Sequence, residues 1–408
     1  MTRPPRVVFV GNFGLWRKGT MGARALPMAA ELRAAGVDAR LVVPPWDEPD
    51  AAGRAGLVYG VPVQNVAVPS GGPGLARHAA IALRLLQATL AQTPDVVVCV
   101  KPKAYAGLLA LLLRRLSRSL SLRLVVDTDD WEGRNGWIEL TPTPRPVKAL
   151  IAWHERAALR AADRVTVASR ALQTLVAADG RPASGIAYLP NATWRGAAGW
   201  ARGDRRRGRA ALGLGEGARL ALLYSRLFEF DATRVAGTIG RLLRGTPAAR
   251  LLVVGAALHG EDADFRNQLR RAGVLDRCRF LGWAKRYELP DLLAAADVAL
   301  VPMDDTLVNR CRCSVKLLDL MLAGRAIVAE PVGQVTEYLE DDASGRLVPP
   351  GDGAAMADAA LELLDEPDLA RRLGRAAESA ARGRFTWSAQ RGALAEAILD
   401  GRGSTFLG

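Results

Sequence analysis

The chain has 408 residues, half of them hydrophobic and about a quarter charged, a balance that excludes a mainly disordered, collagenous or coiled-coil protein. Its formal net charge is +13, and nearly all cations are arginines because only six lysines occur. Two alternatives explain this excess of arginine: codon bias in a GC-rich genome, or a basic binding surface. At roughly 150 residues per domain, the length fits two or three domains.

The charge excess is concentrated in two stretches of the sequence. Residues 76–124 carry eight Lys or Arg and one Asp, and residues 202–209 carry five Arg and one Asp. In the first stretch the apolar run 108–113 is followed directly by Arg114 and Arg115, an order that suits an anionic membrane surface. No recognised nucleic-acid motif accompanies the arginines, so nucleic acid is not expected as a partner.

The sequence predicts neither a leader nor a membrane-spanning segment. The basic start runs into only four apolar residues, Val7–Val10, too few for a leader, and the run Ala104–Leu113 is about half of a membrane span. The four cysteines imply no disulfide framework, so we expect a cytoplasmic protein, with a peripheral membrane role suggested by the basic stretch alone. Cys311 and Cys313 lack a nearby His, so no metal site is predicted.

Short β-branched runs alternate with helical stretches along the chain. Most runs are apolar without polar alternation, which is typical of parallel strands covered on both faces. Strands are predicted at Val7–Val10, Ala39–Val43, Val96–Val100, Arg123–Val126, Arg164–Ala168, Ile186–Leu189, Leu220–Tyr224, Leu251–Val254, Arg279–Leu281, Val298–Val301, Ala326–Ala329 and Arg346–Val348. Helices are predicted between them, such as Leu26–Ala35 and Ala355–Leu364. This alternation predicts an α/β fold with parallel sheets.

A Gly- and Arg-rich stretch separates two series of strands. Residues 193–217 lack an apolar period and are interpreted as a linker with flanking loops. We therefore predict two Rossmann-like domains, residues 1–192 and 218–385, and a closing segment, residues 386–408. Ligands of open α/β sheets bind beyond the carboxyl ends of the strands, so we expect the two sheets to face each other across a cleft.

Two glycine-containing turns, Gly11–Gly14 and Gly19–Gly22, follow the first predicted strand. Glycines there let backbone N–H groups approach an anion at a helix N-terminus; the alternative is that they only form tight turns. The GxGxxG spacing is missing, and the second strand ends in Pro-Pro-Trp at residues 44–46 rather than in an acidic residue. A nicotinamide cofactor is therefore not expected.

Charged residues follow two apolar strands of the first domain. Lys101 follows one strand, and Asp127, Asp129, Asp130 and Glu132 lie at the end of the other. The carboxylates can hold acceptor hydroxyls or deprotonate one, or they form an acidic N-cap cluster for the next helix. Lys101 and the lysine two residues later pair with these acids or hold an anionic acceptor. Our candidate catalytic residues are Lys101, Asp127, Asp129 and Asp130.

Two arginines near the start of the second domain are candidate phosphate ligands. Arg226 directly follows a predicted strand, and Arg234 lies eight residues further on. A guanidinium group gives two parallel charge-assisted hydrogen bonds to a diphosphate. The alternative for both arginines is an ion pair with Glu229 or Asp231.

The helix predicted after Ser314 combines an N-cap residue with two charges. Lys316 lies in its first turn, and Asp319, three residues on, lies on the same face among apolar residues. A carboxylate in such surroundings needs a partner, either Lys316 or the two hydroxyls of a ribose. The N–H groups of Val315 and Lys316, with the Lys316 ammonium, are suited to hold a phosphate beside it.

At these residues the sequence resembles the retaining GT-B glycosyltransferases of the family-4 type (glycosyl transferases group 1). The resemblance covers nearly the whole chain and is strongest after Leu220. It rests on Gly19–Gly22, Ala162-Asp163 with Ser169, Pro190-Asn191, Leu281-Gly282-Trp283, Ala295–Pro302, Ser314–Gly324, Val332-Gly333-Gln334 with Glu337, Gly345–Asp352 and Phe385-Thr386-Trp387. It implies a GT-B fold whose C-terminal helix crosses back onto the first domain.

The resemblance also implies an activity: transfer of a sugar from a UDP- or GDP-linked donor to a hydroxyl of a glycan or lipid-linked precursor, with retention of configuration and no cofactor. Cationic side chains and a helix end replace a metal in neutralising the leaving diphosphate. The implied donor residues are Gly19, Gly22, Arg226, Arg234, Leu281, Trp283, Ser314, Val315, Lys316, Leu317 and Asp319. Among them, Arg226 and Lys316 are expected at the diphosphate and Asp319 at the ribose.

The sequence departs from the family pattern at three places. Of the family's two glutamates, the second corresponds to Asp319 and the first to Cys311, which cannot act as a carboxylate. The family's lysine after Arg226 falls near Asp231, and a histidine of the first domain is replaced by Lys101. These departures motivate an alternative, a non-catalytic nucleotide-sugar-binding protein or scaffold with the same fold.

Overall fold

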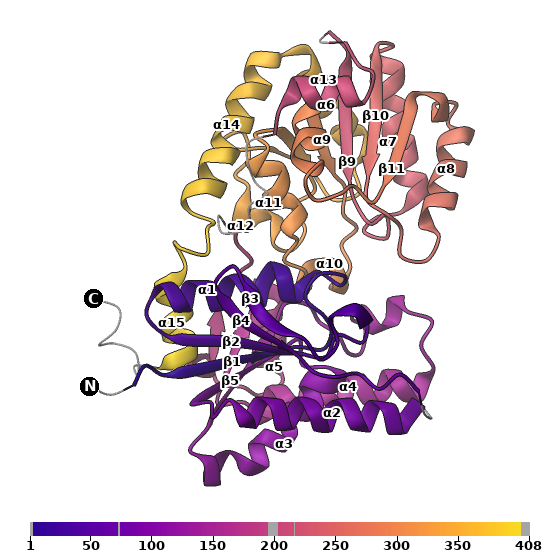
Figure 1. Ribbon diagram of the computed structural model, residues 1–408. Helices are drawn as coiled ribbons and strands as arrows, with labels where there is room; N and C mark the ends of the chain where they lie inside the picture. The colour runs from indigo at the N-terminus through magenta and orange to yellow at the C-terminus, as the bar shows by residue number, and fades with distance from the viewer. Residues whose placement is uncertain (1–2, 72–73, 195–202, 216, 401–408) are drawn as a thin grey trace. The chain divides into compact units, whose positions relative to one another are not determined.

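The computed structural model describes residues 3–71, 74–194, 203–215 and 217–400. The chain divides into two compact units. Unit 1 comprises Met1–Gly196, Cys311–Cys313 and Trp387–Gly408, and unit 2 comprises Ala197–Arg310 and Ser314–Thr386. Each unit is built on one mainly parallel sheet with helices packed against it (Figure 1). The predicted pair of Rossmann-like α/β domains is therefore confirmed.

Unit 1 contains an eight-stranded sheet in the order β3-β4-β2-β1-β5-β6-β7-β8. All neighbours are parallel except β3 and β4. The central strands are wholly buried because their apolar side chains are covered on both faces. The strands are β1 (Arg6–Val10), β2 (Asp38–Val43), β3 (Ala55–Val58), β4 (Val61–Asn65), β5 (Val96–Val100), β6 (Arg123–Thr128), β7 (Arg164–Val167) and β8 (Ile186–Tyr188).

The helices of unit 1 include the C-terminal one, α15, which packs against α1, β5 and β7. Its Leu394 and Ile398 share a core with Trp387, so the predicted return of the chain end to the first domain is confirmed. The helical segments are η1 (Met21–Ala25, a π-helical turn), α1 (Leu26–Ala34), η2 (Pro49–Ala51), α2 (Gly74–Ala91), α3 (Ala104–Leu120), η3 (Trp137–Leu140), α4 (Arg145–Ala161), α5 (Arg170–Ala178), η4 (Ala183–Gly185) and α15 (Arg391–Leu399). Residues 401–408 of the predicted closing segment lie outside the described residues.

Unit 2 contains a six-stranded parallel sheet in the order β11-β10-β9-β12-β13-β14. Its strands are β9 (Arg219–Tyr224), β10 (Ala249–Val254), β11 (Cys278–Gly282), β12 (Val298–Val301), β13 (Ala326–Ala329) and β14 (Arg346–Leu347). Its helical segments are α6 (Arg205–Ala211), α7 (Ala232–Gly245), α8 (Glu261–Arg271), η5 (Leu275–Arg277), α9 (Leu289–Ala295), α10 (Leu307–Cys311), α11 (Val315–Leu322), α12 (Val335–Tyr338), α13 (Gly353–Asp365) and α14 (Pro367–Gly383). All predicted strands of both domains are present.

The β3–β4 hairpin was not predicted from the sequence. Tyr59 and Gly60, which join the two strands, both have positive φ angles, as a two-residue turn of type I′ requires. The strand β3 is largely exposed, and Pro62 interrupts the apolar pattern of β4. Neither strand therefore shows the continuous apolar run that identifies the buried strands.

Part of the predicted linker is a helix that belongs to unit 2. Helix α6 packs against α9 so closely that a Cβ at Gly208 would lie 2.0 Å from the carbonyl oxygen of Asp291. Its Arg209 is buried and donates to the carbonyl of Ala295. The basic stretch 202–209 is thus partly structural, although Arg202 lies outside the described residues.

The apolar run followed by Arg114 and Arg115 is only partly buried. On α3, the side chains of Leu109 and Leu113 are buried in unit 1, whereas Leu108, Leu111 and Leu112 are half-buried. A membrane role of this stretch stays a prediction. No helix in the described ranges is both long enough and apolar enough to cross a membrane.

The strand order reverses twice, between β1 and β5 in unit 1 and between β9 and β12 in unit 2. Side chains beyond the carboxyl ends of strands at such a reversal can bind ligands, because the connections diverge there and leave a crevice. Both groups of charged residues predicted from the sequence follow strands at or next to these reversals.

Candidate functional site

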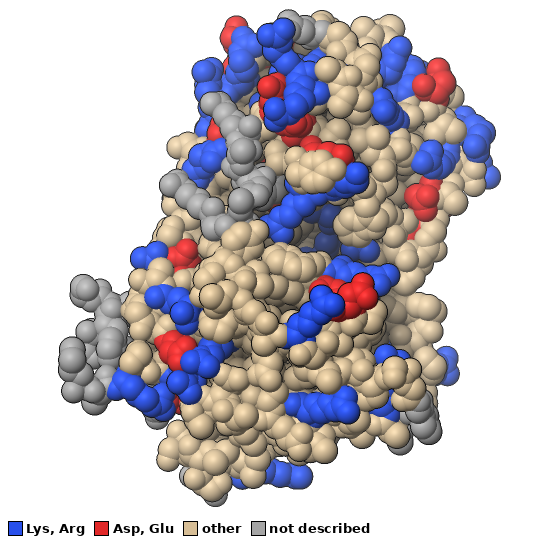
Figure 2. Space-filling view, in the orientation of Figure 1, with Lys and Arg blue, Asp and Glu red and all other residues tan. Residues whose placement is uncertain are grey.

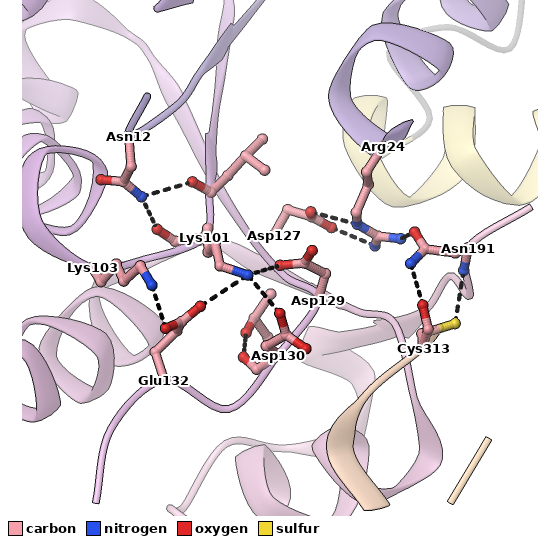
Figure 3. Close-up of polar contacts among 12 residues, drawn as sticks. Asn12, Arg24, Lys101, Lys103, Asp127, Asp129, Asp130, Glu132, Asn191 and Cys313 are labelled. Carbon is pink, nitrogen blue, oxygen red and sulfur yellow. Dashed lines mark hydrogen bonds and ion pairs between the residues drawn. The ribbon is translucent and has the colours of Figure 1, made fainter. Parts of the chain in front are cut away.

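The first group of site residues gathers around the ammonium group of Lys101. Strands β5 and β6 are parallel, with Val100 opposite Asp127, so the residues that follow them emerge at the same sheet edge. The Nζ atom of Lys101 lies 3.2 Å from Asp129 Oδ1, 2.6 Å from Asp130 Oδ2 and 2.9 Å from Glu132 Oε1 (Figure 3). The structure thus favours pairing of Lys101 with the acids over a free cation for an anionic acceptor.

The backbone of Lys101 is held in a left-handed conformation, with φ at 61°. For a residue with a Cβ this costs on the order of 1–3 kcal/mol. The side chain of Asn12, from the turn after β1, donates to the carbonyl of Lys101 (Figure 3). Its oxygen accepts from the N–H of Ala106. Asn12 therefore fixes the strained residue that presents the ammonium group.

The charges of this cluster shift one another's pKa values. Burial alone would lower the pKa of Lys101, but the three surrounding carboxylates raise it well above its usual value. Burial alone would raise the pKa of Asp129, but the nearby Lys101 outweighs this effect, so the pKa of Asp129 is lowered overall. The pKa of Asp130 is raised by burial and by the neighbouring Asp129 and Glu132. Lys101 opposes this rise. Among the carboxyl groups around Lys101, Asp130 is therefore the one best suited to accept a proton.

Asp127 does not belong to this cluster in the way predicted. Its two carboxylate oxygens accept from Nε and Nη2 of Arg24, each at 2.7 Å, and both side chains are buried (Figure 3). Thr166 also donates to Asp127. With its oxygens engaged and no exposed surface, Asp127 has a structural role, because a buried arginine requires a paired anion.

The loop after β6 is anchored to helix α4. Glu155 of α4 accepts from the N–H groups of Glu132 and Gly133, at 2.8 and 2.7 Å. Burial raises the pKa of Glu155 to about 8. Lys103 forms a second ion pair with Glu132. Helix α4 thus positions the carboxylates, which is a different arrangement from an acidic N-cap of the following helix.

The second group of site residues lies in unit 2, at the carboxyl end of β9. The backbone N–H of Arg226 donates to Glu229 at 3.0 Å, and Nε donates to the carbonyl of Ala256. The half-buried guanidinium lies 4.9 Å from the ring centroid of Trp283. The indole is 69 % exposed, so it presents an open aromatic face beside a cation.

Helix α11 brings Lys316 and Asp319 to the same end of β9. Nζ of Lys316 lies 3.2 Å from Oε1 of Glu229, so one buried carboxylate contacts both Arg226 and Lys316. The hydroxyl of Tyr224 donates to Asp319 Oδ2 at 3.4 Å. Burial raises the pKa of Asp319 to about 7, with Lys316 and the Tyr224 contact opposing the rise. The partners of Asp319 and Lys316 are therefore on β9 and the loop after it rather than each other.

Arg234 is held by carboxylates other than those considered from the sequence. Its guanidinium contacts Glu330, at 2.5 Å, and Asp304, at 2.6 Å. Glu330 is fully buried and also accepts from the N–H of Gly351. The structure therefore favours an ion-pair role for Arg234 over donor binding.

The remaining predicted donor residues differ in how accessible they are. Ser314 is the N-cap of α11 but makes no capping hydrogen bond, and Val315 and Leu281 are half-buried. Leu317 is buried in unit 2, so only its backbone is available to a ligand.

The two glycines of the first-domain loop have different roles in the backbone. Gly19, in unit 1, has a φ of +83° and open space around it. A Cβ at Gly22 would meet the carbonyl of Leu15 at 2.8 Å, so Gly22 is required by packing. This packing requirement accounts for Gly22 without a ligand, and it differs from both roles considered from the sequence, anion binding and a tight turn.

The segment that carries Cys311 belongs to unit 1, although it precedes α11. Ser169 donates to the carbonyl of Cys311. The side chain of Asn191 donates to the carbonyl of Cys313, and its backbone N–H donates to the Cys313 thiol (Figure 3). Both cysteines are buried, and neither forms a disulfide. Within the described part of the chain, no group of three or more His, Cys, Asp or Glu side chains is placed to hold a metal ion.

Four residues of these two groups were not singled out from the sequence, and Glu229 was considered only as an ion-pair partner of the two arginines. The four are Asn12 and Arg24 in unit 1 and Tyr224 and Arg286 in unit 2, where Arg286 opposes the rise in the pKa of Asp319. The positions of Asn12, just after β1, and of Tyr224, at the end of β9, could have indicated them, whereas Arg24 lies in η1, away from a strand end. The partners of Arg24 lie up to 167 residues away.

Comparison with known proteins identifies both halves of the chain. Residues 19–192 match the model of the glycosyl transferase 4-like domain, and residues 228–366 match that of the glycosyl transferases group 1. The catalytic domain of starch synthase IV from Arabidopsis thaliana, bound to ADP and acarbose, superposes with a TM-score of 0.74 at 14 % identity, covering 97 % of this chain and 98 % of that chain. The Anabaena protein HepE, in complex with UDP and glucose, gives 0.68 at 18 %, covering 95 % and 98 %.

Sequence relatives match over shorter segments. A phosphatidyl-myo-inositol mannosyltransferase of Mycobacterium leprae is 32 % identical over 139 residues, covering 34 % of each chain. A D-inositol 3-phosphate glycosyltransferase of Catenulispora acidiphila is 30 % identical over 203 residues, 48 % of this chain and 46 % of its own. The chain thus spans between about a third and a half of these relatives' lengths.

Two Rossmann-like units with these two domains, in this order, define the GT-B class. The chain belongs to the GT-B glycosyltransferases of the family-4 type.

Proposed function

We propose that the protein transfers a sugar from a UDP- or GDP-linked donor to a hydroxyl of a glycan or lipid-linked precursor, with retention of configuration, in the cytoplasm. The observation that carries this proposal is the cluster at the end of β9, where Glu229 contacts both Arg226 and Lys316 and Tyr224 contacts Asp319. Arg226, Lys316 and Asp319 are all partly accessible. The two cations match the negative charge of a diphosphate, and the carboxylate is suited to the ribose hydroxyls of a nucleotide.

The two cations are suited to bind the diphosphate and to stabilise it as the leaving group. Glu229 fixes the backbone of Arg226 and holds the ammonium of Lys316, so both charges are positioned before a ligand binds. The N–H groups at the start of α11 form the positive end of that helix and are suited to donate to a phosphate. Charge that develops on the departing diphosphate is thereby neutralised by this chain's own groups.

Asp319 is suited to accept hydrogen bonds from the two hydroxyls of a ribose. It lies three residues after Lys316 on α11, so a ribose there would be next to the phosphates. The exposed Trp283, which contacts Arg226, offers its ring face to a planar base.

The acceptor is proposed to bind at the Lys101 cluster of unit 1. Asp130 is the candidate to accept the acceptor's proton, because its pKa is raised by burial and by like charges. Lys101 contacts Asp130 and orients it, and Asp129 in turn contacts Lys101. The relatives support this class of reaction, since one is named a phosphatidyl-myo-inositol mannosyltransferase and HepE was solved with UDP and glucose.

Calorimetric titration with UDP- and GDP-sugars tests the donor site. Asp319→Ala and Arg226→Ala should each weaken binding by at least ~1.5 kcal/mol, the scale of hydrogen bonds to charged groups. The control is Arg241→Ala, which removes an exposed arginine of unit 2 that pairs with Asp358 and should leave affinity unchanged. Unchanged affinity in both site variants would refute this donor site.

The alternative is a non-catalytic protein that binds nucleotide sugars. Cys311 in place of a family glutamate favours it, because this buried thiol cannot act as a carboxylate. Donor binding without release of nucleoside diphosphate from any donor, in the presence of acceptor extracts, would support this alternative.

A further inference from the structure

Helix α4 exposes large apolar side chains that nothing in the described structure covers. Val147, Leu150 and Trp153 are 42 %, 50 % and 56 % exposed. Leu150 and Trp153 are three residues apart and therefore lie on neighbouring positions of the same helical face. Burying such residues is worth about 1.5–3 kcal/mol each, so an exposed group of them indicates a binding surface.

The exposed charges of the same helix are all positive. Helix α4 carries Arg145, Lys148, Arg156 and Arg160, and its single acid, Glu155, is buried. Lys148 pairs with Glu139, and Arg156 and Arg160 both contact Asp179. Arg145 is exposed and has no ion-pair partner in the described ranges. The four cations outnumber these two acids, so the surface keeps a net positive charge. An apolar group of side chains flanked by arginines, with a tryptophan between them, has the composition of a surface that binds anionic lipids.

This composition disfavours a second copy of the chain as the occupant. A symmetric dimer through this face would place the same patch against itself, and so would bring the arginines of two α4 helices together. Opposed like charges in an interface cost free energy. A layer of anionic headgroups instead neutralises the arginines while its acyl region receives Leu150 and Trp153.

The same helix supports the proposed acceptor cluster. Glu155 of α4 accepts from the N–H groups of Glu132 and Gly133, and Glu132 contacts Lys101. An acceptor anchored in the lipid beneath α4 would therefore present its head to the loop that this helix holds. We propose that the exposed face of α4 around Val147, Leu150 and Trp153 docks unit 1 on an anionic lipid surface beside the acceptor site; the link to an acceptor rests on the proposed function.

Co-sedimentation of the full chain with phospholipid vesicles tests this surface. The protein should sediment at low salt with vesicles that contain phosphatidylglycerol, and much less with pure phosphatidylcholine or at high salt. Leu150→Glu and Trp153→Glu should each reduce binding at least about tenfold, because each removes the burial of one large apolar side chain. Both residues are exposed, so melting temperatures should be unchanged.

The matched control is Leu120→Glu at the end of α3. Leu120 is 48 % exposed and lies in the basic stretch that first suggested a membrane role, and this variant should bind vesicles like the unchanged protein. Failure of the unchanged protein to bind phosphatidylglycerol vesicles, or binding that only Leu120→Glu impairs, would overturn the proposal. A dimer in solution that Leu150→Glu dissociates, without vesicle binding, would assign the face to a second copy and would also overturn it.

Titration with nucleotide sugars in the absence of vesicles separates the two proposals. Normal donor binding without vesicle binding contradicts only the α4 surface. Vesicle binding that Leu150→Glu abolishes, in a protein that binds no nucleotide sugar, contradicts only the proposed transferase activity.

Discussion

Asp319 is the residue whose ionisation should be visible in donor binding. Its pKa is raised to about 7 by burial, and the ionised form is the better acceptor for ribose hydroxyls. Affinity for a UDP- or GDP-sugar should therefore increase as pH rises through this pKa, and should be about tenfold higher at pH 8 than at pH 6. Nucleotide sugars are the suitable probes because a doubly esterified diphosphate does not itself titrate in this range.

Asp319→Asn provides the control for this pH dependence. The amide keeps the shape of the side chain but cannot ionise, so the variant should bind weakly and with the same affinity at both pH values. A pH-dependent affinity that persists in Asp319→Asn would show that another group titrates, and would contradict the role given to Asp319.

Asp127 should control stability rather than catalysis. Asp127→Asn leaves the buried Arg24 without its anion, and breaking a buried pair in this way costs about 3–5 kcal/mol. Chemical denaturation should show this loss, whereas Asp358→Asn, which breaks the exposed pair with Arg241, should not measurably change stability. A variant Asp127→Asn with normal stability and no turnover would instead identify Asp127 as catalytic.

At the scale of elements, helix α6 should be part of the folded body of unit 2. Gly208→Ala places a Cβ 2.0 Å from the carbonyl oxygen of Asp291, which requires a backbone shift of α6 from α9 and should cost about 1–3 kcal/mol. Gly237→Ala is the matched control, because Gly237 lies in α7 with open space around it. This second substitution should stabilise by about 0.5–1 kcal/mol.

Thermal unfolding of both variants distinguishes a docked helix from a loose linker. The melting temperature should fall for Gly208→Ala and rise for Gly237→Ala. Equal rises in both variants would contradict the packing of α6 on α9.

The buried parallel strands could be predicted because their signal is local. Val96–Val100, for example, is a continuous apolar run that coincides with β5. The hairpin β3–β4 and helix α6 lack such a run, since one is exposed and the other is rich in Arg and Gly. The hairpin forms by local pairing of β3 with β4, whereas helix α6 packs on α9, which is far away in the chain.

The site was predicted at the level of residue types but not of pairings. The spacing of Lys316 and Asp319 correctly placed both on α11. Their partners, Glu229 and Tyr224, are 87 and 95 residues away from them, and a single sequence contains no signal for such distant pairs. Local spacing offered Lys316 and a ribose as alternative partners of Asp319, and it gave no signal for the contacts with Glu229 and Tyr224.

At the scale of the whole molecule, the positive charge is not gathered at one site. Figure 2 shows Lys and Arg side chains scattered over both units, many of them beside acids. Arg207 pairs with Asp291, Arg160 with Asp179 and Arg241 with Asp358. The net charge of +13 is therefore a poor guide to function, and the few cations that matter are identified by position.

The division of the chain into two units was only partly predictable from the sequence. Two sheets with separate cores explain why two domain models match. The short segment Cys311–Cys313 and the chain end from Trp387 onward belong to unit 1 although unit 2 precedes them in sequence. Strand patterns predicted the two sheets, whereas the assignment of these segments depends on tertiary contacts such as that of Asn191 with Cys313.

Release of nucleoside diphosphate from a panel of UDP- and GDP-sugars, followed by mass spectrometry, tests the central claim most directly. The unchanged protein should hydrolyse or transfer at least one donor, with EDTA present or absent, and Asp319→Ala and Arg226→Ala should reduce the rate at least about tenfold, since each removes a charged hydrogen bond to the donor. Arg241→Ala should react like the unchanged protein. No release from any donor, or equal rates in the site variants, would contradict a glycosyltransferase whose donor is held by Arg226, Lys316 and Asp319.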